Sequence, residues 1–152
     1  MIKEQLDIDL KEAMKAKDAV RLATIRSLRA AIMEKEIAMR QGGVAHLSEE
    51  DVLTVVGKQA KQRRDSIEQF TAAGREDLAA REEAELEILS TYLPEQLDAD
   101  AIRREVQTIV EQTGATGMKD MGRVMGAAMT ALSGRADGKD VQQIAREVLS
   151  AI

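Results

Sequence analysis

The segment Leu93-Pro94-Glu95-Gln96-Leu97 contains the one proline of this 152-residue chain. A proline pushes the residue before it towards an extended backbone, so a helix tends to end at this segment. On both sides of it, apolar residues recur every three or four positions, which is the period of an amphipathic helix. The sequence therefore predicts an all-α, multihelical fold in two lobes. Residues 1–93 would form a bundle of about four helices, and residues 94–152 a smaller lobe of three.

Helix start and stop signals divide the first lobe. The first helix is expected over about residues 2–17, and Asp18 is a candidate N-cap for a second that Gln41-Gly42-Gly43 ends. Ser48 with Asp51 forms the acidic variant of a capping box and starts a third helix that runs to Gly74. A fourth helix follows over about residues 76–92.

The second lobe has similar signals. Asp98 or Asp100 can cap a fifth helix, which ends near Gly114. A short sixth helix is expected over about residues 119–132, followed by a turn at residues 133–138. The seventh helix then finishes the chain, with Asp137 as its candidate N-cap.

Composition agrees with helix-on-helix packing and limits the chemistry. Hydrophobic residues make up 44% of the chain and charged residues 32%, while the only aromatic residues are Phe70 and Tyr92. The core must therefore come from Leu, Ile, Val, Ala and the eight Met. Because the chain has no Cys, it has no disulfide, no thiolate nucleophile and no Cys-ligated zinc.

Charge and hydropathy bear on partners and location. The net charge of −5 argues against general binding of polyphosphate over the whole surface, but screening limits this argument to long range and it does not apply to a local basic patch. The charged segment Met1–Asp7 lacks the apolar run of a signal peptide. No uncharged apolar run approaches the roughly 18 residues of a membrane span. We therefore expect a cytoplasmic protein without a membrane partner.

No catalytic or metal centre is legible in the residues. His46 is the only histidine, and the acidic residues near it are better explained as partners of a helix N-terminus than as ligands that converge on a metal. The carboxylates of residues 82–87 point in successive directions around a helix, which is typical of a solvated face. The sequence thus predicts no catalytic residue, no metal and no cofactor.

Two arginines fall on apolar stripes when the helices are projected at 100° per residue. Arg29 lies in the stripe of the second helix, with Glu36 near its direction two turns later, and Arg63 lies in that of the third. A charge on a core-facing stripe is costly unless it is paired. The plain interpretation is a structural ion pair, or a long side chain that reaches the stripe edge. The functional alternative is a polar cleft formed by Arg29, Glu36 and Arg63.

The C-terminal segment carries the strongest functional signal. Gly122 and Gly126 recur at i, i+4 in a helix, where each glycine costs about 1 kcal/mol relative to Ala, so close approach of a helix or ligand is expected. Gly134 and Gly138 flank a turn with basic side chains beside a helix N-terminus, which can receive a phosphate. Capping by Asp137 is an equally weighted alternative. The basic residues of this segment are Lys119, Arg123, Arg135, Lys139 and Arg146.

Four stretches together resemble the GatB/YqeY family. They are MGRVMG at 121–126, GRADGK at 134–139, RLATIRSLRAAI at 21–32 and ELEILSTYLPEQL at 85–97. The likeness covers nearly the whole chain and is strongest to the stand-alone YqeY-like proteins. It implies a two-lobed helical fold, a bundle followed by a small three-helix lobe. The same module forms the C-terminal region of the B subunit of glutamine-dependent tRNA amidotransferases, where it is regarded as a tail that contacts tRNA.

The resemblance implies binding rather than catalysis. This sequence has neither the kinase-like catalytic domain nor the amidase nucleophile of that enzyme, so a carbon–nitrogen ligase label with glutamine as amido-N-donor would describe the parent. We expect a non-catalytic module that binds tRNA, or a protein partner from the aminoacylation or amidotransferase machinery, through the five basic residues above. The alternative is a protein–protein adaptor whose Met- and Gly-rich helix docks a partner helix.

Overall fold

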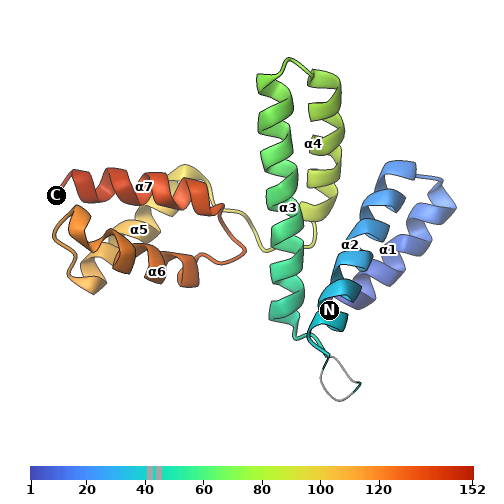
Figure 1. Ribbon diagram of the computed structural model, residues 1–152, viewed down its shortest axis with the longest axis horizontal. Helices are drawn as coiled ribbons and strands as arrows, with labels where there is room; N and C mark the ends of the chain where they lie inside the picture. Colours follow the sequence, from blue (N-terminus) through green and yellow to red (C-terminus); the bar gives the residue numbers. More distant parts are fainter. Residues whose placement is uncertain (41–42, 44–45) are drawn as a thin grey trace. The chain divides into compact units, whose positions relative to one another are not determined.

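The computed structural model describes residues 1–40, 43 and 46–152, and over this part of the chain the regular secondary structure is helical with no strand. The all-α prediction is confirmed. The helices are α1 (Ile2–Ala16), α2 (Ala19–Ala38), α3 (Glu49–Ala72), α4 (Glu76–Ser90), α5 (Ala99–Thr113), the 3-10 helix η1 (Met118–Asp120), α6 (Met121–Ala131) and α7 (Gly138–Ser150) (Figure 1). The chain divides into two compact units, Met1–Leu93 and Pro94–Ile152.

Local side-chain chemistry begins several of these helices where the sequence predicted. The Asp18 carboxylate accepts from the Arg21 N–H at 3.1 Å, and Ser48 and Asp51 form the reciprocal capping box. Asp98, rather than Asp100, caps α5 by accepting from the Ala101 N–H at 2.8 Å. Of the glycines expected to end α2, Gly42 lies outside the described residues, and Gly43 has a positive φ of 83°.

The predicted sixth helix begins two residues later than expected because residues 118–120 form a 3-10 turn. The side chain of Asp120 accepts from the Thr116 N–H at 2.8 Å, and the Asp120 N–H bonds to the Gly117 carbonyl at 3.0 Å. These contacts tighten residues 118–120 into η1, since i→i+3 bonds are typical of helix starts. The α-helix proper begins at Met121.

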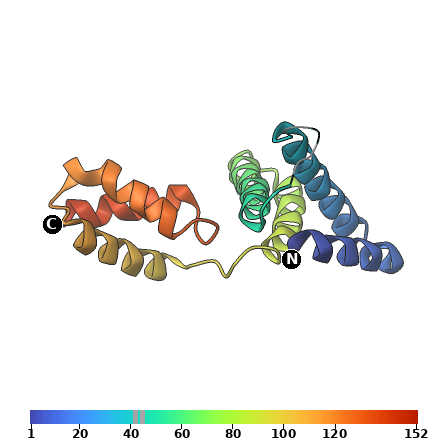
Figure 2. The ribbon, with the colours of Figure 1, turned by 90° about the horizontal axis from the view of Figure 1, so that it is seen from below.

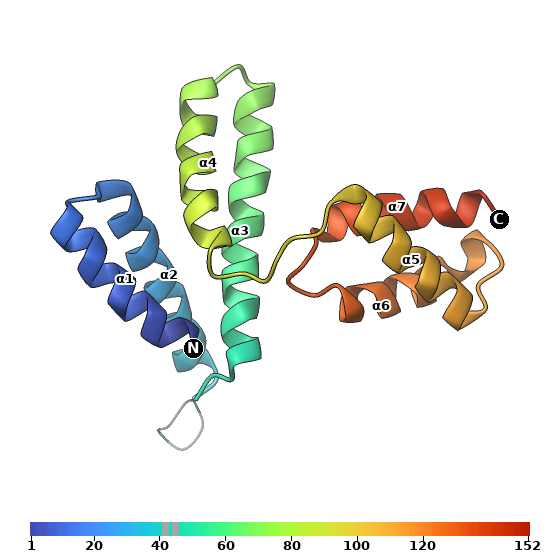
Figure 3. The same cartoon turned by 180° about the vertical axis from the view of Figure 1, so that it is seen from behind.

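The first unit consists of two helix pairs, α1 with α2 and α3 with α4 (Figure 3). Its core residues lie where the pairs meet and are almost fully buried, as shown by Leu6, Ile25, Leu28, Val56 and Leu89. Further along, the second half of α3 packs against the first half of α4. Between described residues 57 and 88, only Ala60 and Ala79 are fully buried there. This end of the pair therefore has little apolar core of its own.

The second unit is a three-helix arrangement of α5, α6 and α7 (Figure 2). Its core contains Ile102, Val106, Val124, Val141 and Leu149, each buried from solvent. None of the helices in the described part of the chain is both long and apolar enough to cross a membrane.

Candidate binding surfaces

A polar stripe runs along the exposed side of α7. The opposite side of the helix is buried, with Val141, Ile144 and Leu149 in the core. The exposed stripe contains only uncharged or cationic side chains, namely Lys139, Gln142, Gln143, Arg146 and Ser150. The nearby carboxylate of Glu147 pairs with Arg103 of α5, and this contact lowers the pKa of Glu147. The α7 stripe is thus rich in hydrogen-bond donors, and the exposed carboxylate of Asp140 lies at its edge, next to Lys139.

The turn before α7 is held by the beginning of the second unit. The Leu97 N–H donates to the Arg135 carbonyl at 2.8 Å, and the Gln96 side-chain amide donates to the Gly134 carbonyl at 2.7 Å. Gly134 adopts a φ of 77°, which a residue with a side chain would resist. The backbone that carries Arg135 is therefore fixed beside the start of the α7 stripe.

The N-terminus of α7 is capped as the plain interpretation expects. The Asp137 carboxylate accepts from the Lys139 N–H at 3.3 Å. A carboxylate at this position uses one free amide and repels an anion. The structure thus favours capping over a phosphate site on these amides, and leaves the side chains of the α7 stripe as the candidate phosphate contacts.

Lys119 and Arg123 lie on either side of a carboxylate. Arg123 pairs with Asp120 at 3.0 Å, and the pKa of Asp120 is lowered by the Thr116 N–H bond and by the charges of Arg123 and Lys119. The positive charge here is therefore partly compensated. The Ser150 hydroxyl donates to the Met118 sulfur at 3.5 Å, which places η1 beside the C-terminal end of α7. The five predicted cations thus extend from the turn before α7 to the helix beside its end.

The predicted close-approach glycines behave differently from one another. A Cβ built on Gly122 or Gly126 would meet nothing within 4 Å, so no helix of this unit uses the space they leave. A Cβ on Gly138 would lie 3.5 Å from the terminal methyl of Met129. The face of α6 with Gly122 and Gly126 is open.

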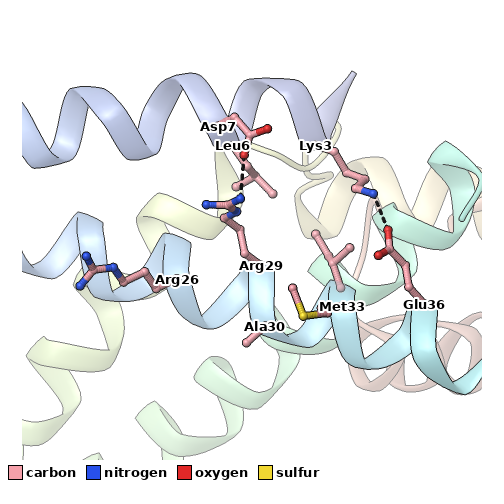
Figure 4. A pocket seen from close by; sticks show the side chains of 9 residues that line it. Lys3, Leu6, Asp7, Arg26, Arg29, Ala30, Met33 and Glu36 are labelled. Atoms are coloured by element: carbon pink, nitrogen blue, oxygen red, sulfur yellow. Dashed lines mark hydrogen bonds and ion pairs between the residues drawn. The ribbon is translucent and has the colours of Figure 1, made fainter. Parts of the chain in front are cut away.

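The three residues of the predicted polar cleft do not share one site. Arg29 pairs with Asp7 at 3.0 Å, and Glu36 pairs with Lys3, along a groove of about 520 Å³ between α1 and α2 (Figure 4). Arg63 lies between α3 and α4. Arg29 is 45% exposed and ion-paired on the rim of the groove, as the plain interpretation of an ion pair at the stripe edge predicted, and the functional alternative of a shared polar cleft is not supported.

Arg63 is paired with two carboxylates of α4. Its Nε lies 2.8 Å from Glu85 and 3.4 Å from Glu82, and all three side chains are about four-fifths buried. The interpretation of residues 82–87 as a solvated face therefore fails for Glu82 and Glu85. The contact is one of charge, since neither Arg63 Nε nor Glu82 Oε2 has a partner in hydrogen-bonding geometry. Arg63 belongs to a structural ion triad.

Sequence reasoning missed a buried polar cluster centred on Asp9. This residue of α1 is only 7% exposed. The Tyr92 hydroxyl donates to one of its oxygens, the Gln5 amide donates to the other at 2.9 Å, and Arg21 lies 3.3 Å away. The one sequence signal was its position between Leu6 and Ala13 on the buried face of α1. The cluster joins α1, α2 and the segment after α4.

The alkaline titration of Tyr92 is a direct test of this cluster. Burial and the bond to the Asp9 carboxylate raise the pKa of Tyr92 well above its usual range. Because the neutral phenol is favoured in the folded state, its contribution to stability is full below the unfolded pKa of about 10 and is lost as the pH rises above it. Tyr92 is the only tyrosine, so tyrosinate absorbance reports it alone. We expect its ionisation to coincide with unfolding of the first unit; a normal titration in folded protein would contradict the cluster.

His46 is exposed, and no group of three His, Cys, Asp or Glu side chains among the described residues is placed to hold a metal ion. Arg29, Glu36 and Arg63 are each paired with an oppositely charged side chain: Arg29 with Asp7, Glu36 with Lys3, and Arg63 with Glu85. Such mutual pairing is what a structural role predicts for these residues.

Comparison with known proteins gives one consistent family. A family model described as "Yqey-like protein" matches residues 3–149. Three relatives are each named "Altered inheritance of mitochondria protein 41, mitochondrial". The protein of Vanderwaltozyma polyspora is 34% identical over 74% of this chain and 63% of its own length. That of Eremothecium gossypii is 41% identical over 56% and 45%. That of Pyrenophora tritici-repentis is 31% identical over 97% and 80%.

The extent of these matches decides what they show. In the first two of these relatives the match spans about half to two thirds of the relative's length, so the whole activity of those proteins does not transfer with the likeness. The family match, in contrast, covers both compact units and all the helices described above. The chain belongs to the Yqey-like protein family.

Proposed function

We propose that this chain is a non-catalytic binding module whose C-terminal unit contacts tRNA through the α7 stripe and the turn before it. The observation that carries the proposal is that Lys139 and Arg146 stand two helical turns apart on one exposed stripe of α7, with glutamines between them and the carboxylate of Asp140 only at its edge. Two turns place them roughly 10 Å apart along the helix. Cations aligned on a rigid helix, with glutamines between them, are suited to phosphate and sugar contacts.

The fixed turn extends this surface. Arg135 stands on backbone that Gln96 and Leu97 hold in place, so little ordering is needed when its side chain meets a phosphate. Lys119 and Arg123 would add contacts beyond the end of α7, although Asp120 weakens them. The tRNA tail of the related amidotransferase subunit agrees with this assignment.

Binding through so few cations should depend steeply on salt. Five phosphate contacts give a slope of roughly −3.5 to −4.5 for log K against log salt concentration. We expect labelled tRNA to bind at low salt, and the variant Lys139→Ala with Arg146→Ala to lose about tenfold or more in affinity and about 1.4 to 1.8 in the magnitude of the slope.

A matched control keeps the change in net charge the same. Lys11 and Lys15 are exposed on α1 of the first unit, so Lys11→Ala with Lys15→Ala should leave binding within about twofold if the α7 stripe carries it. Absence of tRNA binding at low salt, or equal losses in the two double variants, would sink the proposal.

An adaptor role is the second candidate, favoured by the open face of α6. Gly122 and Gly126 leave space there, with Met118 and Met129 at 44% and 39% exposure near it. A partner helix could approach closely over such glycines. A partner that stays bound in nuclease-treated lysate, and is lost on Gly126→Leu but not in the Lys139 and Arg146 double variant, would favour this role over tRNA binding.

The compartment is a separate question. The sequence predicts a cytoplasmic protein, whereas the names of the similar fungal proteins include the word mitochondrial. Both compartments contain tRNA, so the binding proposal does not depend on which of them holds this chain.

A further inference from the structure

The outer face of α2 carries a second stripe of regularly spaced residues, of which four are apolar and one is an arginine. The side of α2 that faces the core contains Ile25, Leu28 and Ile32. On the opposite side, five exposed residues follow one another at intervals of three, four, three and four positions, namely Ala23, Arg26, Ala30, Met33 and Ile37. This is the spacing of the a and d positions of a coiled coil. We refer to these five residues as the outer seam.

The outer seam leaves large apolar side chains in water. Met33 is 60% exposed and Ile37 is 57% exposed, one turn apart. Between α2 and α1 the seam borders the 520 Å³ groove, whose lining includes the buried side chains of Leu6 and Ile32. A helix that packed along the seam would cover the side chains of Met33 and Ile37 and this edge of the groove.

We propose that the occupant of the outer seam is the same helix of a second copy of this chain, running antiparallel. In an antiparallel coiled coil the a positions of one helix face the d positions of the other. With the pair centred between Ala31 and Ile32, residues whose numbers add up to 63 face each other. Ala30 then faces Met33 of the second copy, so a small side chain meets a large one in both symmetric layers.

Charge favours the same register. Arg26 faces Ile37 of the second copy, and its guanidinium comes next to the second copy's Glu36, a carboxylate that already pairs with Lys3 of its own chain and would be shared between the two cations. No carboxylate among the described residues is recorded as a partner of Arg26 within its own chain, where Figure 4 shows it extended away from the Lys3–Glu36 and Arg29–Asp7 pairs. The twofold pairing repeats this Arg–Glu contact, whereas a parallel pairing would place Arg26 against Arg26.

The interface predicted by this pairing is small, because only one helix per copy takes part. We expect a weak dimer with a dissociation constant on the order of 10 to 100 μM. Sedimentation equilibrium of the full chain up to several hundred micromolar should show the dimer. A monomer throughout that range would overturn the proposal.

Substitutions at the exposed Ile37 distinguish the proposed charge pairing from non-specific hydrophobic association. Ile37→Arg places a cation opposite Arg26 and should weaken the dimer about tenfold or more. Ile37→Glu removes the same apolar side chain but faces Arg26 with a carboxylate, so dimerisation should stay within about threefold, as it should for Arg26→Glu with Ile37→Arg. Equal weakening by Ile37→Arg and Ile37→Glu would overturn the register. Ala84→Arg on the exposed side of α4 serves as the charge control, and circular dichroism checks that each variant is folded.

Disulfide trapping tests the geometry directly, because the natural chain has no cysteine. A mixture of the Ala30→Cys and Met33→Cys variants should oxidise readily to the mixed dimer, since facing small positions bring Cβ atoms within disulfide range. Ala84→Cys mixed with either variant should not. Trapping that is no faster than with Ala84→Cys would contradict the antiparallel pairing.

Discussion

Replacing Asp9 with alanine is expected to lower the free energy of unfolding of the first unit by about 3 kcal/mol. The carboxylate lies in the interior and receives three partners, so its removal leaves the Tyr92 hydroxyl and the Gln5 amide without an acceptor. Arg21 keeps a contact to Glu12 at 3.4 Å, which limits the loss. Urea unfolding followed by tyrosine fluorescence measures this unit alone, because the only tyrosine is Tyr92.

Asp7 provides the control for this prediction. It lies two residues earlier on α1 and also has an arginine partner, but its side chain is 58% exposed. Exposed pairs contribute little, so Asp7→Ala should change the stability by about 0.5 kcal/mol or less. Asp9→Asn keeps one acceptor oxygen and should recover part of the loss. If Asp7→Ala and Asp9→Ala were equally destabilising, burial of the Asp9 cluster would not be the cause.

Local rules explain which parts of the fold could be read from the sequence. The caps at Asp18, Ser48 and Asp98 depend on residues at most three positions away, so the pattern of residue types is enough to find them. The α period likewise needs only neighbouring turns. In contrast, Asp9 and Tyr92 are separated by 83 positions, and no local rule joins a carboxylate on the first helix to a phenol before the proline.

The two stripe arginines show a second limit. A helical projection gives the direction of a side chain but not how far the neighbouring helix extends over it. Arg29 points to the rim of the α1–α2 groove, and so it stays exposed. Arg63 points in an equivalent direction on its own helix, yet Glu82 and Glu85 of α4 lie against it and it is only 19% exposed. The same position on a helical projection thus corresponds to an exposed ion pair for Arg29 and to a largely buried ion triad for Arg63.

The same limit applies to the candidate binding surfaces. Sequence order could name the cations of the second unit, because residue types are visible in it. It could not show that Glu147 pairs with Arg103, which leaves Asp140 and the cap Asp137 as the carboxylates beside the α7 stripe. Nor could it show that Asp120 stays beside Arg123. Which charges remain available is decided by contacts between helices.

The largest effect expected outside the Asp9 cluster is that of Arg63→Ala, at about 2 kcal/mol. Without the guanidinium, the carboxylates of Glu82 and Glu85 would face each other in a largely buried place. Only Ala60 and Ala79 are fully buried in this part of the α3–α4 pair, so little apolar packing can compensate. Urea unfolding measures the loss, and hydrogen exchange over residues 61–85 should show the opening locally.

A second variant distinguishes charge from packing. Replacing the whole triad by Arg63→Met, Glu82→Leu and Glu85→Leu should give a free energy of unfolding within about 1 kcal/mol of that of the natural chain, or higher. The reason is that the attraction between buried charges is largely offset by the cost of removing them from water. Arg81→Ala on the exposed side of α4 should change the stability by less than about 0.5 kcal/mol. Repulsion between the two carboxylates also predicts that salt reduces the cost of Arg63→Ala. If Arg63→Ala instead matched Arg81→Ala at every salt concentration, the triad would be a solvated surface contact, and the α3–α4 pair would be held by its alanines and by the half-buried Ile67, Phe70, Leu78 and Leu86.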